Sequence, residues 1–334
     1  SVSGYTDSYL VFIGGLIFFI PMLIFFLSEK FIKINYGLLL PRKGLINFRV
    51  ELLVSLFLIV VAFFLYQKMG INLSFDDSYE RRILGREAIQ GTLAYFLLMS
   101  LNGLAPLLSF LAIYNRRYRY LIIAFSFVLL GFAFVGTKAP IAYVFLMSFI
   151  AIYFNRGGEN IVFILVLAMT SLIFLAMVEY LLFGISLIAD TFVRRAVLIM
   201  PQLQMYFLDF MFNSNNYFSF LTGSESETSV SFLVGEQYLN RPGANANTIS
   251  FFTVMARSGV VGYLLSILFV TVFFSFLAYM YKYSKHKVWI AISTLYALIM
   301  LEQSYSTAFI SSGIGLGTMF LLMFNYQSKG QGND

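Results

Sequence analysis

The chain alternates between long apolar runs and short polar segments. Apolar runs of about 20 residues are long enough to cross the roughly 30 Å hydrocarbon layer as helices. The pattern predicts about nine transmembrane helices, at residues 9–27, 52–66, 91–114, 121–135, 140–154, 161–182, 259–281, 288–301 and 308–324. A long polar segment, 186–258, separates the sixth helix from the seventh. We therefore expect an all-α, polytopic helical membrane protein with a long loop that contains an amphipathic helix. All of it forms a single integral membrane domain, 1–334.

The composition supports this class of protein and excludes several kinds of catalytic and metal site. Hydrophobic residues make up 60% of the chain and charged residues only 11%, whereas soluble domains carry about 25% charged residues. The chain contains no cysteine, so thiol catalysis, disulfides and thiolate metal sites are excluded. The single histidine, His286, lies in the basic run YKYSKHK. We expect no Ser-His or multi-histidine metal mechanism, and neither a metal nor a cofactor.

The distribution of charge predicts the orientation in the membrane. Lys and Arg exceed acids in the loops at 29–49, 115–119 and 282–287, and are balanced or absent at 68–87 and 190–257. Because positive loops stay cytoplasmic, the N-terminus is predicted outside and the C-terminus inside. The chain begins at Ser1 rather than at a methionine, which leaves room for preceding sequence and for another helix in it. Since the net charge of +6 resides mainly in short loops, we do not expect nucleic-acid binding.

The first part of the long segment carries polar residues at helical spacing. Arg195, Gln202, Tyr206 and Asp209 are separated by seven, four and three residues, which places them on one face of a helix. This predicts a helix at the membrane surface with its polar stripe towards a cavity. The alternative is that Arg194 and Arg195 only contact lipid phosphates.

The second part of the long segment contains the run RPGANANT. Pro and Gly predict a loop after Arg241, in which Asn245 and Asn247 could recognise sugar hydroxyls. Arg257 follows shortly before the seventh helix. The alternative is a turn with a helix cap and an interfacial arginine.

The predicted outer loop DDSYERRILGRE, residues 76–87, mixes acids with arginines. Its carboxylates could bind a divalent cation, but the neighbouring arginines compete for them. A salt-bridged loop is one reading, and the other is that Arg82 and Arg86, at positions i and i+4, bind an anion.

Three further charged residues lie at predicted helix ends. Lys138 occupies the tight hairpin GTKAP between two short helices, where a lysine below the interface suggests a function. A helix start, with Thr137 as its cap, favours phosphate there, although Lys138 could also extend to the interface. Glu179 and Glu302 are candidate general bases, with an interfacial acid as the alternative reading.

Cationic groups gathered on one predicted outer face suit an anionic amphiphile such as a lipid-linked diphosphate sugar. Arginine binds phosphate bidentately and could stabilise a departing diphosphate, which often needs a metal ion.

With these motifs in order over about residues 75–265, the chain resembles the O-antigen polymerase (Wzy) family of bacterial inner-membrane proteins. The resemblance is carried by DDSYERRILGRE, GTKAP, RRAVLIMPQLQMYFLDFMFN and NANTISFFTVMARSGVVG. It implies a metal-independent glycosyltransferase with a periplasmic active face, which polymerises undecaprenyl-diphosphate-linked repeat units and works with a Wzz-type chain-length regulator.

The resemblance also suggests roles for individual residues. Arg195 and Arg257 would bind diphosphate, supported by Arg194, Arg82, Arg241 and Lys138. Asn245 and Asn247 would contact glycan or order the loop, Gln202 and Tyr206 would bind substrate, and Asp209 and Glu302 are the candidate bases.

Two other functions fit a membrane protein that handles lipid-linked sugars. A flippase is expected to show repeated halves and charges buried across several helices, whereas here polar residues concentrate on one predicted face. O-antigen ligases rely on an outer-loop histidine, which this chain lacks. The polymerase is therefore favoured over the ligase.

Overall fold

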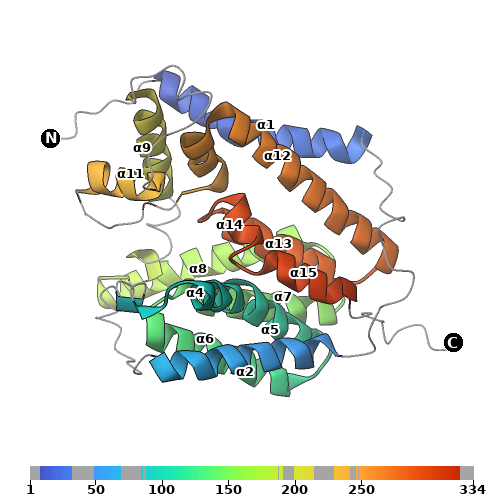
Figure 1. The fold of residues 1–334 in the computed structure, drawn as a ribbon. Helices are drawn as coiled ribbons and strands as arrows, with labels where there is room; N and C mark the ends of the chain where they lie inside the picture. The colour runs from blue at the N-terminus through green and yellow to red at the C-terminus, as the bar shows by residue number, and fades with distance from the viewer. Residues whose placement is uncertain are drawn as a thin grey trace. The chain divides into compact units, whose positions relative to one another are not determined.

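The computed structural model describes residues 8–31, 49–68, 84–85, 88–186, 188–190, 199–213, 229–240, 246 and 248–323. Among these residues the regular secondary structure is helical, joined by turns, and no strand forms. The helices in chain order (Figure 1) are α1 (Ser8–Phe31), α2 (Val50–Lys68), α4 (Thr92–Met99), the π-helix η2 (Ser100–Leu104), α5 (Ala105–Tyr114), α6 (Tyr118–Val135), α7 (Ala139–Asn155), α8 (Ile161–Phe183), α9 (Met200–Asn213), α11 (Val230–Leu239), α12 (Ser250–Ser284), α13 (Val288–Met300), α14 (Tyr305–Phe309) and α15 (Ile314–Met323).

The predicted class, a helical membrane protein, is supported by the length and apolar character of these helices. Within the described residues, 6 helical stretches are long and apolar enough to cross a membrane: α1, α2, the continuous run α4–η2–α5, α6, α8 and α12. Three shorter apolar helices, α7, α13 and α15, complete the set that the hydropathy pattern predicted. The predicted number of about nine membrane crossings stays a prediction.

Three predicted helices differ in detail from those observed. The helix predicted at 259–281 begins earlier, at Ser250, and bends at Gly259, whose φ of 64° and ψ of −165° are not helical. A side chain other than hydrogen would be strained in this conformation, so glycine makes the bend feasible. The helix predicted at 91–114 contains the π-helix η2, and the one predicted at 308–324 is divided into α14 and α15.

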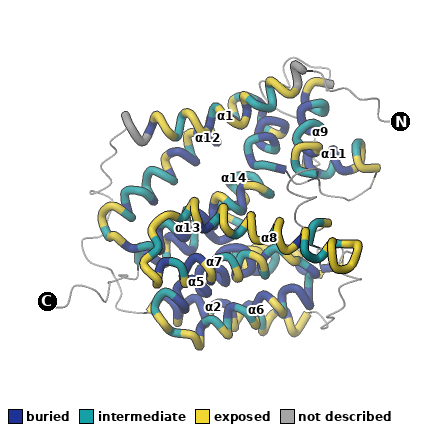
Figure 2. The backbone as a smooth tube through the Cα atoms, turned by 180° about the vertical axis from the view of Figure 1, so that it is seen from behind, coloured by how far each residue is buried: buried dark blue, intermediate teal, exposed yellow. Residues whose placement is uncertain are grey.

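The helices form two compact units. The first contains Ser1–Ile34, Val162–Ser275 and Met300–Tyr305, and the second contains Asn35–Ile161, Phe276–Ile299 and Ser306–Asp334. In the second unit α5 is the central helix, because every residue from Ala105 to Ile113 is buried. It packs against α6 and α7, and α2 packs against α6. The burial of α5 is visible in Figure 2.

The first unit has its own apolar core, which joins α1, α9, α11 and the start of α12. Phe207 and Leu208 of α9 are fully buried there, beside Phe252 of α12. The hydroxyl of Tyr263 donates a hydrogen bond to the Ile17 carbonyl oxygen at 3.0 Å and so ties α12 to α1. This core decides where the polar residues of α9 can point.

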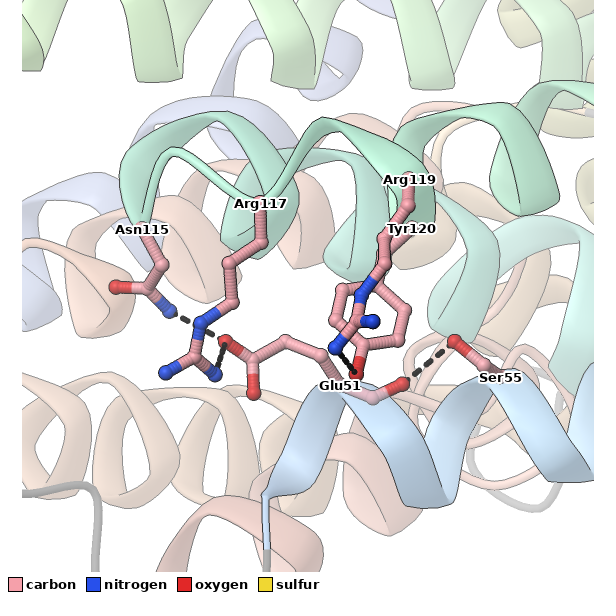
Figure 3. A network of polar contacts seen from close by, with 6 residues as sticks. All are labelled: Glu51, Ser55, Asn115, Arg117, Arg119 and Tyr120. Atoms are coloured by element: carbon pink, nitrogen blue, oxygen red, sulfur yellow. Dashed lines mark hydrogen bonds and ion pairs between the residues drawn. The ribbon is translucent and has the colours of Figure 1, made fainter.

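A buried ion pair fastens α2 within the second unit. Glu51 is only 3% exposed, and its Oε1 accepts hydrogen bonds from Asn115 Nδ2 at 2.7 Å and Arg117 Nη1 at 3.0 Å. Figure 3 shows both donors on the turn between α5 and α6, facing Glu51 at the start of α2. Ser55 Oγ donates to the Glu51 carbonyl oxygen at 2.6 Å. A buried carboxylate needs such partners, so the network fixes α2 to this turn.

A more exposed ion pair links the segment after α7 to the loop between α12 and α13. Lys287 Nζ is 3.7 Å from the Glu159 carboxylate, which is 86% exposed, and donates to the Gly158 carbonyl oxygen at 3.3 Å. Its ammonium group also lies over the Phe154 ring, 5.1 Å from the centroid. The contact joins the end of α7 to the loop after α12.

Candidate functional site

The polar stripe predicted in the long segment is found on α9. The described helix covers Met200 to Asn213, and its apolar face, with Leu203, Phe207 and Leu208, is buried in the core of the first unit. Gln202 is exposed, while Asp209 is half-buried. Gln202 Nε2 donates a hydrogen bond to Tyr206 Oη at 2.5 Å, as expected for side chains one turn apart. A helix with one apolar and one polar face is therefore present over these residues, while its position at the membrane surface stays a prediction.

A residue that the sequence analysis missed completes this stripe. Tyr238 of α11 donates a hydrogen bond from its hydroxyl to Asp209 Oδ2 at 2.8 Å. Its ring stacks on the Tyr206 ring, with centroids 5.0 Å apart and planes inclined by 22°. Tyr238 lies 29 residues after Asp209, so no local spacing links the two. We call Gln202, Tyr206, Asp209 and Tyr238 the α9–α11 polar cluster.

The cluster is positioned by the apolar face of α11. Val230 and Val234 of this helix are buried in the same core as α9. The helix ends at Leu239 and is capped by Asn240, which has a left-handed conformation (φ 50°, ψ 38°). The Ala246 amide donates to the Ser231 carbonyl oxygen at 2.9 Å and returns the chain to α11. The buried face of α11 and the hydrogen bond from Ala246 to Ser231 thus hold Tyr238 against α9.

Arg257 lies on the first part of α12, two residues before the bend at Gly259. Its side chain is exposed, whereas the preceding Met255 and Ala256 belong to the core shared with α9 and α11. The structure therefore brings Arg257 and Asp209 onto helices that pack around one core.

Glu179 has a structural task at the end of α8. Its carboxylate accepts hydrogen bonds from Ser186 Oγ at 2.7 Å and from the Ile188 amide at 3.0 Å. Ser186 Oγ in turn accepts one from the Ala189 amide at 2.9 Å, in the manner of an N-cap. A groove of about 590 Å³ against this turn is lined mainly by apolar residues, among them Met177. Glu179 thus orders the start of the long segment.

The remaining described candidates lie elsewhere. Glu302 is half-buried in the turn between α13 and α14, in the first unit. Lys138 is exposed at the start of α7, in the second unit, with Pro140 in the first turn. The predicted cap is wrong, because Lys138 itself occupies the N-cap position and Thr137 Oγ1 makes no hydrogen bond. The turn between the two helices begins at Gly136, which caps the end of α6 in the left-handed conformation.

Several predicted site residues lie outside the residues that the structure describes: Arg82, Arg86, Arg194, Arg195, Arg241, Asn245 and Asn247. Within the described part of the chain, no three acidic or histidine side chains gather as they would around a metal ion.

The fold and these sites define a helical membrane protein whose α9–α11 polar cluster rests on an apolar core. Comparisons with protein-family models, with curated proteins and with solved structures found no match.

Proposed function

We propose that this protein is a glycosyltransferase of the bacterial inner membrane, which polymerises undecaprenyl-diphosphate-linked oligosaccharide repeat units at the periplasmic face without a metal ion. The observation that carries the proposal is the α9–α11 polar cluster, with Asp209 accepting a hydrogen bond from Tyr238, on a core shared with the helix that bears the exposed Arg257. The resemblance to the O-antigen polymerase (Wzy) family supplies the reaction. A Wzz-type regulator is the proposed partner.

In the proposed reaction a hydroxyl at the non-reducing end of one repeat unit attacks the anomeric carbon at the reducing end of the growing glycan. The new carbon–oxygen bond forms as the bond to the diphosphate breaks. Undecaprenyl diphosphate leaves with the electron pair. Asp209 is the proposed base that takes the hydroxyl proton, with Glu302 as the other candidate. Arg257, together with Arg195, is proposed to stabilise the negative charge on the leaving diphosphate.

The test is a polymerisation assay with the purified protein in lipid nanodiscs. Repeat units linked to undecaprenyl diphosphate, from the source organism, are incubated in the presence of EDTA and the products are separated on a gel. We expect a ladder with repeat-unit spacing. Arg257→Ala should slow its formation by about 100-fold or more, because a transition-state charge contact is worth roughly that factor.

Arg156→Ala is the matched control, because Arg156, like Arg257, is an exposed arginine. It follows α7 as its C-cap and lies on the predicted cytoplasmic side. It should polymerise at the wild-type rate. No ladder from the wild-type protein would rule the polymerase out. An equal loss of polymerisation rate in both variants would show that Arg257 does not stabilise the leaving diphosphate.

A flippase for lipid-linked oligosaccharides is the second candidate, and one feature of the second unit favours it. The buried run α4–η2–α5 is interrupted by a π-helix, and α14 and α15 form a divided helix. Transporters often place their substrate site at discontinuous membrane helices. Movement of a fluorescent lipid-linked oligosaccharide across proteoliposomes, without polymerisation, would establish this function instead.

A further inference from the structure

We propose that the α9–α11 polar cluster is a carbohydrate-binding subsite, in which the rings of Tyr206 and Tyr238 contact a sugar and Gln202 and Asp209 bind its hydroxyl groups. The name of the ligand, a repeat-unit oligosaccharide, rests on the proposed function. The subsite itself rests on the geometry of four side chains from two helices. It assigns Tyr238 a role that its position in the sequence does not suggest.

The aromatic part of the argument starts from the stacked rings. Tyr206 and Tyr238 are stacked at 5.0 Å between centroids, and each is half-buried. The faces of aromatic rings carry partial negative charge. The C–H faces of a sugar ring are apolar and weakly positive, so they pack against such faces. Because each ring covers one face of the other, a sugar would pack against an outer face of the stack. That face is fixed in orientation, so binding costs little side-chain entropy.

The polar part of the argument comes from groups held beside the rings. Gln202 is exposed and its amide is oriented by the hydrogen bond to Tyr206 Oη. The Tyr238 hydroxyl donates a hydrogen bond to the Asp209 carboxylate and so holds it beside the stacked rings. A carboxylate makes strong, charge-assisted hydrogen bonds to hydroxyl donors, and an amide both donates and accepts. These are the groups that a polyhydroxylated ligand needs.

Charge decides which part of a lipid-linked sugar this subsite takes. Asp209 contributes a carboxylate to the cluster, and a carboxylate repels a diphosphate at close range. The subsite therefore suits the sugar rings of the repeat unit, and leaves the diphosphate to cationic residues such as Arg257.

The experiment measures binding of a free oligosaccharide by saturation-transfer difference NMR, with irradiation of the aromatic protons. The probe is the reducing oligosaccharide that mild acid releases from the source organism's own lipid-linked repeat units. The wild-type protein in nanodiscs should transfer saturation to the sugar C–H protons. Gln202→Ala changes an exposed side chain and should raise the Kd by about threefold to tenfold, the range of a lost hydrogen bond.

Two substitutions at Tyr238 separate the ring from the hydroxyl. Tyr238→Leu removes the stacked ring and should raise the Kd by about tenfold or more. Tyr238→Phe keeps the ring but loses the contact with Asp209, so saturation transfer should persist with weaker binding. Wild-type affinity in both Tyr238→Leu and Gln202→Ala would overturn the subsite.

A second stacked tyrosine pair in the chain provides the matched control. Tyr279 and Tyr283 of α12 have centroids 6.3 Å apart and planes inclined by 8°, and Tyr283 is exposed. Tyr283→Leu should bind the probe like the wild-type protein. An equal loss in Tyr283→Leu and Tyr238→Leu would overturn the proposal as well.

The two proposals can fail separately. Binding that depends on Tyr238 in a protein that forms no ladder would reject the polymerase and keep the subsite. A ladder from the wild-type protein, with probe binding unchanged by the α9–α11 substitutions, would keep the polymerase and reject the subsite.

Discussion

Two carboxylates in the second unit illustrate how burial changes the value of an ion pair. Glu51 is 3% exposed and serves both Asn115 and Arg117 through one oxygen. Glu159 is 86% exposed and lies 3.7 Å from Lys287. Water competes strongly for the exposed Glu159 carboxylate and much less for the buried Glu51 carboxylate. The first pair therefore contributes to holding the helices together, whereas the second contributes little.

This difference predicts the effect of removing each carboxylate. Glu51→Ala should cost about 1–3 kcal/mol, because it removes a buried carboxylate that accepts hydrogen bonds from two half-buried donors. Glu159→Ala should cost about 0–1 kcal/mol, as is usual for an exposed pair. The measurement is the thermal unfolding midpoint of each variant in the same detergent. Equal midpoints for the two variants would show that the Glu51 network does not stabilise the fold.

At the same scale, the sequence predicted only part of the candidate site. Gln202, Tyr206 and Asp209 share a helix, so their spacing is enough to place them on one face. Tyr238 reaches Asp209 only because α11 packs against α9 around buried residues such as Phe207 and Val234. A contact of this kind depends on tertiary packing, which periodicity does not encode. Glu179 was considered as a base for the same reason, since its capping contacts involve a turn that hydropathy does not reveal.

At the scale of elements, two helix interruptions, the π-helix η2 and the break between α14 and α15, meet in one tight contact. Gly103 of η2 lies against the backbone around Ser312 and Gly313, so closely that an added Cβ would collide with the Ser312 carbonyl oxygen. Gly313 has a positive φ of 77°, and a Cβ there would lie 2.6 Å from the Met99 carbonyl oxygen. The two glycines therefore permit η2 to pack directly against the break between α14 and α15.

Gly103→Ala should accordingly destabilise the protein by about 1–3 kcal/mol, the usual cost of overpacking a close contact. Gly15→Ala is the matched control, because a Cβ at Gly15 of α1 meets nothing within 4 Å. It should be neutral or slightly stabilising, since alanine has the higher helix propensity. The readout is again the unfolding midpoint in detergent. A Gly103→Ala protein as stable as Gly15→Ala would mean that the two backbones can separate without cost.

Hydropathy located the helices but not these interruptions, and the reason is physical. The run at 92–114 stays apolar through η2, so its hydropathy carries no trace of the π-helix. At the bend, Arg257 and Ser258 precede Gly259, so hydropathy begins the predicted helix at 259 and misses the helical residues 250–258. A π-turn or a bend needs only one glycine and a neighbour that fits against it. Which glycine is used depends on the partner helix. The sequence therefore predicts that a helix exists more reliably than it predicts its continuity.

At the scale of the whole molecule, the distribution of exposed apolar side chains supports a membrane setting. α8 is apolar on all sides, with mean hydropathy 2.9 and only 11% of its most apolar 18-residue stretch buried. α1 also exposes large apolar residues such as Phe12, Phe19 and Phe26. Exposed apolar helices of this length are unfavourable in water, and they are visible as exposed stretches in Figure 2. Contact with lipid would remove the exposed apolar side chains of α1 and α8 from water.

The orientation predicted from the charge of the loops can be tested because the chain contains no cysteine. A single cysteine introduced at an exposed position is then the only target for a membrane-impermeant maleimide. Gln237→Cys, on α11, should react in intact spheroplasts, since the long segment is predicted to face the periplasm. Tyr283→Cys, at the basic end of α12, should react only after the membrane is permeabilised. Both side chains are exposed, so the membrane is the only barrier that distinguishes them. Labelling in the reverse order would place the α9–α11 polar cluster in the cytoplasm, where it could not act on lipid-linked sugars presented at the periplasmic face.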